Sequence, residues 1–194
     1  MALNVRIFET DPDAKPKTYV PDVVGRFRSG RMEGRRPVAL EEWRVTTGDP
    51  EVAEQIAAIL GGTPEEWDTE AEDNIEVLTD ADTVKVIVDS ADALDSDFKL
   101  WGANKAIIHH CDGVEFLDDD RKGEPCGCPR MFAERKDHAK SGRGPKPDTR
   151  ITFRLADAPD LGKFRMQSGS WDLVRIIHEY ANALDDVDGP ALCT

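Results

Sequence analysis

The most regular spacing of apolar residues lies between Asp49 and Gly62, where they recur every three or four positions. This is the spacing of one face of an α-helix. The residues that share this face are Val52, Ile56, Ile59 and Leu60. An Asp side chain can cap the start of a helix, proline suits the first turn, and paired glycines stop it. The segment TGDPEVAEQIAAILGG therefore predicts a helix that begins after Asp49 and ends before Gly61.

Three further helices are expected from different signals. Ser170 is a capping residue ahead of apolar positions spaced as one helix face, which predicts a helix through about Leu184. MFAERKDHAKSG, at 131–142, predicts a short basic helix ended by its glycine. TPEEW, at 63–67, matches a capping box, so we expect Trp67 to lie in a short helix of its own.

Alternating apolar and polar residues, the period of a β-strand, mark other segments. RITFRL and KFRMQS, at 150–155 and 163–168, are separated by a short loop and predict a hairpin. Further strands are expected at 75–78, 83–88 and 101–108. Strands that pair locally and are mixed with helices predict an α+β fold, with mostly antiparallel strands and flanking helices, rather than a doubly wound sheet.

The first part of the chain is harder to interpret. LNVRIF, at 3–8, predicts a brief strand, and the proline-rich segment that follows predicts an extended arm. GRFRSGRMEGRRP, at 25–37, predicts a loop or a hairpin with turns at Ser29-Gly30 and Glu33-Gly34. VALEEWRV, at 38–45, is compatible with a strand or a helix.

Composition and charge narrow the class of protein. Apolar residues make up 39% of the chain and charged residues 33%, which is typical of a globular domain. No apolar run is long enough to span a membrane, and the N-terminus lacks the pattern of a signal peptide, so a cytoplasmic location is expected. The net charge of -14 has the wrong sign for a protein that binds DNA through its phosphates.

The charge is unevenly distributed, which predicts a bipolar surface. Residues 45–84 include twelve acidic and no basic residues, whereas 15–44 and 121–154 are rich in Lys and Arg. The simplest interpretation is a set of solvated faces that keep the protein soluble. The alternative is that the acidic surface binds a basic protein partner.

The segment HHCDGVEFLDDDRKGEPCGCP, at 109–129, contains three of the four cysteines. A disulfide is not expected in a reducing compartment, and cysteines in a Cys-x-Cys pair bridge each other only with strain. Reduced thiols brought close together favour a cation between them, and structural zinc (Zn²⁺) is the usual one. Unliganded thiols and redox-active or catalytic cysteines are the other two interpretations.

A tetrahedral zinc site would need a fourth ligand beside Cys111, Cys126 and Cys128. We predict His138, on the basic helix; the alternative is His109, which lies on the same side of a strand as Cys111. The neighbouring histidine at 110 would point away. The remaining cysteine, at 193, is expected to be a small buried apolar residue.

These elements predict three parts of one domain: an N-terminal α+β part at 1–108, a zinc-binding lobe at 109–147, and a C-terminal hairpin and helix at 148–194. Because ALCT follows a turn at 188–190, we expect that a further strand has been cut away after residue 194.

Motifs of common enzymes are missing. The chain has no Gly-x-Ser-x-Gly, phosphate-binding loop, dinucleotide fingerprint or His-Glu-x-x-His. Asp112 and Glu124 lie near the cysteines, but acidic residues are too frequent here for this proximity to indicate a catalytic base. We therefore expect no catalytic residues.

The chain resembles the actinophage recombination directionality factors that act with large serine integrases. The resemblance runs through most of the chain, and the stretches that carry it are VVGRFRSG (23–30), RPVALEEWRVTTGDPEVAEQIAAILGGTPEEW (36–67), CDGVE (111–115), EPCGCP (124–129) and TFRLADAPDLGKFRMQSGSW (152–171). Related sequences carry a fourth cysteine in a Gly-Arg-x-Cys-Lys-Pro stretch, where this chain has Pro145. The resemblance supports Cys111, Cys126 and Cys128 as ligands.

The resemblance implies a protein without enzymatic activity that works in the bacterial host cell. It would bind a phage large serine integrase near its zinc-domain coiled coil and switch it from integration to prophage excision. It implies no independent DNA binding, no membrane and no small-molecule substrate. A few kcal/mol of preference for one synaptic arrangement would be enough to reverse the reaction's direction.

Two surfaces are candidates for the partner. One is the acidic stretch at 49–82, and the other is the Arg-rich segment at 26–36, which Phe27 and Met32 could anchor. A zinc-containing DNA-binding protein of phage replication or recombination, using the basic segments at 26–36 and 130–154, is the alternative function. A metal-dependent hydrolase or nuclease is the third.

Overall fold

The computed structural model describes residues 23–34, 36–69, 71–187 and 189–194. The strand expected at 3–8 and the arm after it lie outside the described residues. The strands are β1 (Val23–Glu33), β2 (Arg36–Thr47), β3 (Pro64–Glu66), β4 (Ile75–Leu78), β5 (Val86–Val88), β6 (Leu94–Trp101), β7 (Ile107–Cys111), β8 (Lys146–Leu155), β9 (Lys163–Ser168) and β10 (Ala191–Cys193). The helices are α1 (Pro50–Leu60), α2 (Phe132–Lys140) and α3 (Trp171–Asp185), with 3₁₀ turns at Ala91–Ala93 and Pro159–Leu161.

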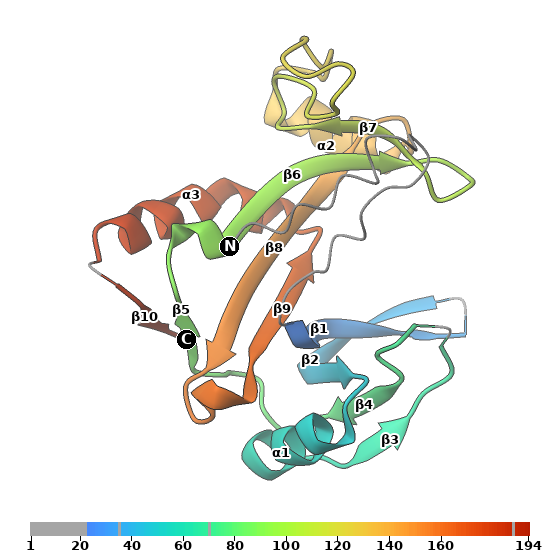
Figure 1. Cartoon of the computed structure of the whole chain (residues 1–194). Helices are drawn as coiled ribbons and strands as arrows, with labels where there is room; N and C mark the ends of the chain where they lie inside the picture. Colours follow the sequence, from blue (N-terminus) through green and yellow to red (C-terminus); the bar gives the residue numbers. More distant parts are fainter. Residues whose placement is uncertain (1–22, 35, 70, 188) are drawn as a thin grey trace, which may run out of the picture.

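The described strands form one mixed sheet (Figure 1). Its order is β10-β5-β8-β9-β1-β2-β4-β3, and β6 pairs with both β8 and β7. The pairing of β1 with β9 is parallel, and the other pairings are antiparallel. The predicted α+β class is therefore confirmed. None of the helices in the described part of the chain is long and apolar enough to cross a membrane.

Three phenylalanines form the centre of the main apolar core. The ring centroid of Phe27 lies 5.3 Å from that of Phe153 and 5.5 Å from that of Phe164, in edge-to-face arrangements that aromatic pairs prefer. Gly25 lies against Phe164, where a Cβ atom would come within 2.9 Å of the ring, so a larger residue would displace it. The buried residues that α1 adds to this core are Val52, Ala53 and Ile56.

The predictions of a helix after Asp49 and of a helix after Ser170 are confirmed. The Asp49 side chain accepts a hydrogen bond from the Glu51 amide, and α1 ends at Leu60. Ser170 accepts one from the Leu173 amide at the start of α3. The basic helix α2 and the β8–β9 hairpin are also present, although β8 begins at Lys146, before the predicted start of the strand at residue 150.

The predicted helix at 63–67 is wrong. Residues 64–66 form β3, which pairs with β4, and the Trp67 amide donates to the carbonyl oxygen of Asn74. Its indole donates to the carbonyl oxygen of Asp73. The capping signal depends only on residues within the segment. It is overridden here because the backbone of the segment forms hydrogen bonds with β4 and Asn74 instead.

The single strand expected at 101–108 is also wrong. A turn at 102–106 separates β6 from β7, and the two strands form a hairpin. In β6, the alternate positions Asp97 and Lys99 are buried and charged, so the usual apolar signal of a strand interior is missing. The ambiguous segments at 25–37 and 38–45 form the hairpin of β1 and β2.

Candidate metal centre

Strand β7 positions two of the predicted site residues. His109 and Cys111 are two residues apart, so their side chains lie on the same side of the strand. Cross-strand pairing of Leu100 with His109 and of Phe98 with Cys111 fixes β7 against β6. The intervening His110 contacts Asp97, with 2.9 Å between Nε2 and the carboxylate, in agreement with the expectation that it points away.

The chain then returns to bring the other two cysteines to β7. At the turn after Cys111, the Asp112 carboxylate accepts hydrogen bonds from the amides of Val114 and Glu115. The Cys126 amide then donates to the carbonyl oxygen of Val114 over 2.9 Å. Gly127 has φ of 72°, a conformation that favours glycine, and it turns the chain so that Cys126 and Cys128 both face the cluster.

The structure gathers four donor atoms from His109, Cys111, Cys126 and Cys128, all within 4.8 Å of one another. The Cys111 and Cys128 sulfurs are 3.9 Å apart, and the Cys128 sulfur is 3.5 Å from His109 Nε2. Zn–S and Zn–N bond lengths of about 2.3 and 2.0 Å at tetrahedral angles imply edges of roughly 3.8 and 3.5 Å. The cluster therefore has donors and spacings that suit a tetrahedral metal ion.

The surroundings favour neutral donors in the absence of a cation. Burial raises the pKa of the Cys111 thiol, and the nearby Cys128 and Cys126 raise it further. Burial also raises the pKa of Cys128, with a contribution from Cys126. Burial lowers the pKa of His109, and the charge of Arg121 adds to that effect, which leaves the imidazole lone pair available. A metal ion would supply the positive charge that thiolates need.

The predicted fourth donor, His138, is not in this group. It lies on α2 and lines a small adjoining cavity with Cys128 and Pro145, and its buried Nδ1 has no hydrogen-bond partner among the described residues. A Cβ atom at residue 144 would come within 2.8 Å of Nδ1, so the glycine there makes room for the ring. The histidine in the group is His109, which was the alternative prediction from its position two residues before Cys111 on a strand. Metal binding by any of these residues stays a prediction.

A buried ionic network, which was not predicted from the sequence, connects this lobe to the sheet. Asp97 lies 3.0 Å from Lys99 Nζ and 2.7 Å from a guanidinium nitrogen of Arg150, and Lys99 lies 2.6 Å from Asp148. The sequence feature that corresponds to this network is the pair of charged residues at alternate positions of β6, Asp97 and Lys99. Since His110 contacts Asp97 of the same network, β7 is also held on the side opposite the cysteines.

Four protein donors would fill a tetrahedral site and leave no position for a substrate, which is the arrangement of structural metal centres. The fold and the cluster thus define a mixed α+β domain with a Cys/His group that could hold a metal ion. The family model described as Gp3-like, recombination directionality factor-like, matches residues 24–193, and the chain belongs to this family. The family name indicates a regulatory protein of DNA recombination that interacts with a recombinase. No solved structure matches the chain.

Proposed function

We propose that this protein is the directionality factor of an actinophage large serine integrase, and that it switches the enzyme from integration to excision without catalysing any step itself. The match of the family model over residues 24–193 is the observation that carries this proposal. The lobe at 109–147 would hold one structural Zn²⁺ through His109, Cys111, Cys126 and Cys128. The action would take place in the bacterial host cell.

The mechanism would be differential binding. A factor that binds one synaptic arrangement of the integrase more tightly than another shifts the equilibrium between them. A preference of about 3 kcal/mol corresponds to roughly a hundredfold shift, which is enough to favour excision. We place the contact near the zinc-domain coiled coil of the integrase, and the zinc would keep the factor's own lobe in a fixed shape for that contact.

The decisive assay incubates the purified integrase of the same phage with DNA that carries both hybrid attachment sites. We expect recombination only when this protein is added, and we expect the two proteins to co-elute in gel filtration. A protein that neither binds the integrase nor changes its products would refute the proposal. DNA binding alone, with the integrase absent, would instead favour the DNA-binding alternative.

The structure weighs against that alternative at one of the two basic segments. Arg26 and Arg28 lie 3.2 and 2.9 Å from the Asp73 carboxylate, and Arg31 lies 2.7 Å from Glu33. Cations already paired with carboxylates release few counterions from DNA, and counterion release provides most non-specific affinity. A weak salt dependence of any DNA binding is therefore expected.

A further inference from the structure

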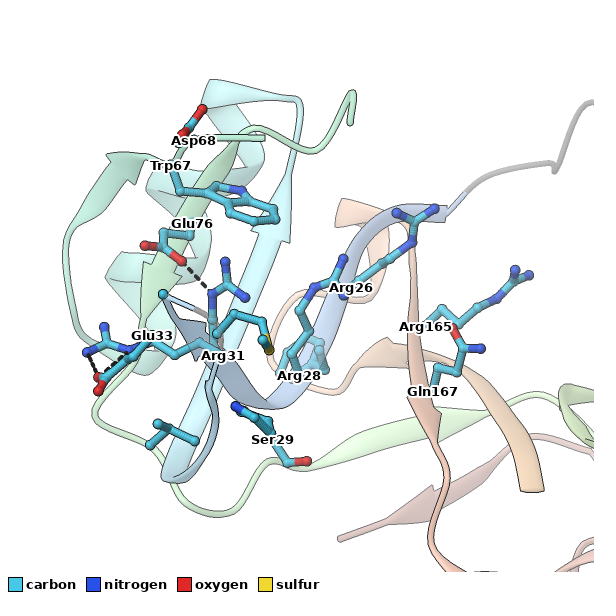
Figure 2. A pocket seen from close by; sticks show the side chains of 17 residues that line it. Arg26, Arg28, Ser29, Arg31, Glu33, Trp67, Asp68, Glu76, Arg165 and Gln167 are labelled. Atoms are coloured by element: carbon cyan, nitrogen blue, oxygen red, sulfur yellow. Dashed lines mark hydrogen bonds and ion pairs between the residues drawn. The ribbon is translucent and has the colours of Figure 1, made fainter. Parts of the chain in front are cut away.

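A polar cleft lies on the sheet face opposite the main core. It consists of two adjoining cavities of about 860 and 510 Å³, which share Gln167 of β9. Because side chains alternate along a strand, Arg26 and Arg28 of β1 and Arg165 of β9 lie on the face opposite Phe27 and Phe164. Figure 2 shows these arginines from neighbouring strands around the larger cavity.

Most arginines of the larger cavity have an acidic partner within the protein. Arg26 and Arg28 pair with Asp73, Arg31 pairs with Glu33, and Arg44 pairs with Glu76. The Arg44 guanidinium also lies 4.4 Å from the ring centroid of Trp67, which restrains it further. These pairs largely neutralise the charges of the four arginines, so a ligand would gain little binding energy from them.

Arg165 is the exception among these arginines. It lies directly beside Arg26 across the parallel pairing of β1 and β9, and it has no ion pair or hydrogen bond with any residue in the described ranges. Its Nε atom is buried and has no hydrogen-bond partner in the part of the chain that the structure describes. A buried donor without an acceptor is unfavourable by more than a typical hydrogen bond contributes. Because Nε is enclosed, a ligand would reach this partly exposed side chain through its terminal guanidinium nitrogens, to which a carboxylate can bind with both oxygens.

Apolar side chains stand at both ends of the cleft. Met32, near the tip of the β1–β2 hairpin, is 60% exposed and lines the larger cavity. Trp101, at the end of β6, is 56% exposed and lines the smaller one. Exposed residues of this size are typical anchors in protein interfaces. Among the described residues, the cleft thus offers two cations without an ion pair, the partly buried Arg165 and the exposed Lys146 of the smaller cavity, together with two apolar contacts.

We propose that this cleft binds an acidic, partly apolar segment of the partner protein, with one carboxylate on Arg165. The inference rests on the proposed function for the identity of the partner, the integrase. A protein segment fits better than DNA for two reasons: the chain has a net charge of -14, and Glu33, Asp68 and Glu76 line the same cavity. A run of phosphates would meet these carboxylates, whereas a single carboxylate can reach Arg165 alone.

The test compares Arg165→Gln with Arg175→Gln. Arg175 is an exposed arginine of α3 outside the cleft, so the two variants change the net charge equally. The probe is a short fluorescein-labelled acidic peptide of Leu and Gln residues with a single central Glu, and the competitors are the same peptide with Gln in place of that Glu and a DNA duplex. We expect Arg165→Gln to weaken binding of the acidic peptide at least about tenfold and Arg175→Gln to change it less than about twofold.

Integrase binding by the same variants separates this inference from the proposed function. If the wild-type protein binds the integrase and Arg165→Gln binds it equally well, the cleft is not the contact and the inference is overturned, while the function stands. If the acidic peptide binds through Arg165 but the integrase does not bind at all, the proposed function fails and the cleft remains a carboxylate site. Stronger competition by DNA than by the acidic peptide would overturn the choice of a protein ligand. Unchanged thermal unfolding of both variants confirms that they are folded.

Discussion

The sheet body and the Cys/His lobe are stabilised in different ways. The body buries a continuous set of apolar side chains around Phe27, Phe153 and Phe164. In the lobe, the buried cluster contains only Cys111, Phe116 and Cys126, with Phe98 and Cys128 partly buried against it. Hydrophobic burial can hold the body together without help, whereas so few side chains cannot order a loop of this length. We therefore expect the lobe to depend on cross-links between its cysteines, which a metal ion would provide.

The sheet body and the lobe contact each other at β6 and α3. Phe98 and Phe132 both pack against Trp171 of α3, and their ring centroids lie 5.7 and 5.4 Å from that of Trp171. The ionic network around Asp97 is also on β6. Because β6 pairs with β8 on one side and with β7 on the other, it is shared by body and lobe. Loss of order in the lobe should therefore stop at β6, and metal removal and a substitution in the core can test this boundary.

Removal of the metal should have the largest effect, and it should be confined to the lobe. Structural zinc contributes about 10–16 kcal/mol in small zinc peptides at neutral pH, more than the lobe's few apolar contacts can replace. We expect about one zinc per purified chain, and we expect both a chelator and Cys126→Ser to abolish amide protection in β7 and at 114–126 while β8 and β9 keep theirs. Metal analysis and hydrogen exchange measure these outcomes.

Cys193→Ser is the matched control, because this half-buried thiol packs against the main core outside the cluster. It should retain the zinc and the protection of the lobe. A metal-free protein with a fully protected lobe would contradict the structural role of the cluster.

Phe164→Ala should have the second-largest effect, and it should lower the stability of the whole sheet body. The Phe164 side chain is fully buried, so its removal leaves a cavity that costs about 3–5 kcal/mol in the free energy of unfolding. Leu192→Ala, at a position that is 69% exposed, should change that free energy by less than about 0.5 kcal/mol. Urea unfolding measures both values. Loss of zinc from folded Phe164→Ala would show that the two regions are not independent.

Asp73 should show the smallest effect, and the effect should depend on pH. Burial by itself raises the pKa of Asp73, but hydrogen bonds from Thr46 and Arg28 outweigh it, and the net pKa lies below the usual value. A carboxylate with a depressed pKa stabilises the fold above the unfolded-state pKa of about 4, and this contribution is lost as the pH falls through the lower folded-state value.

We therefore expect Asp73→Asn to lower the free energy of unfolding by about 1–3 kcal/mol at pH 7, and the difference from the wild type to shrink progressively below about pH 4. Asp68→Asn, at an exposed position, is the control and should have little effect at either pH. Chemical denaturation across this pH range measures both. An equal loss at every pH would mean that packing, rather than the ionised carboxylate, accounts for the change.

Predictions from sequence succeeded where the deciding contacts are close along the chain. The helix after Asp49 and the helix after Ser170 follow from a cap and a periodic apolar face, and neighbouring residues satisfy both. The helix expected at 63–67 failed because its backbone pairs with β4, a partner that the local pattern cannot reveal. Strand β6 was missed because Asp97 and Lys99 are buried in a network with partners more than ten residues away.

The amino-acid sequence by itself determined the class of fold, the family resemblance and the three cysteines of the candidate site, since each of these depends on residue type and short spacing. The tertiary structure decided which histidine stands beside those cysteines and which arginine of the cleft lacks an acidic partner. His109 and His138 were both plausible by spacing, but only His109 lies on β7 with its Nε2 next to the Cys128 sulfur. The physical reason is that a ligand set and an ion pair depend on distances across the fold, which the order of residues along the chain does not specify.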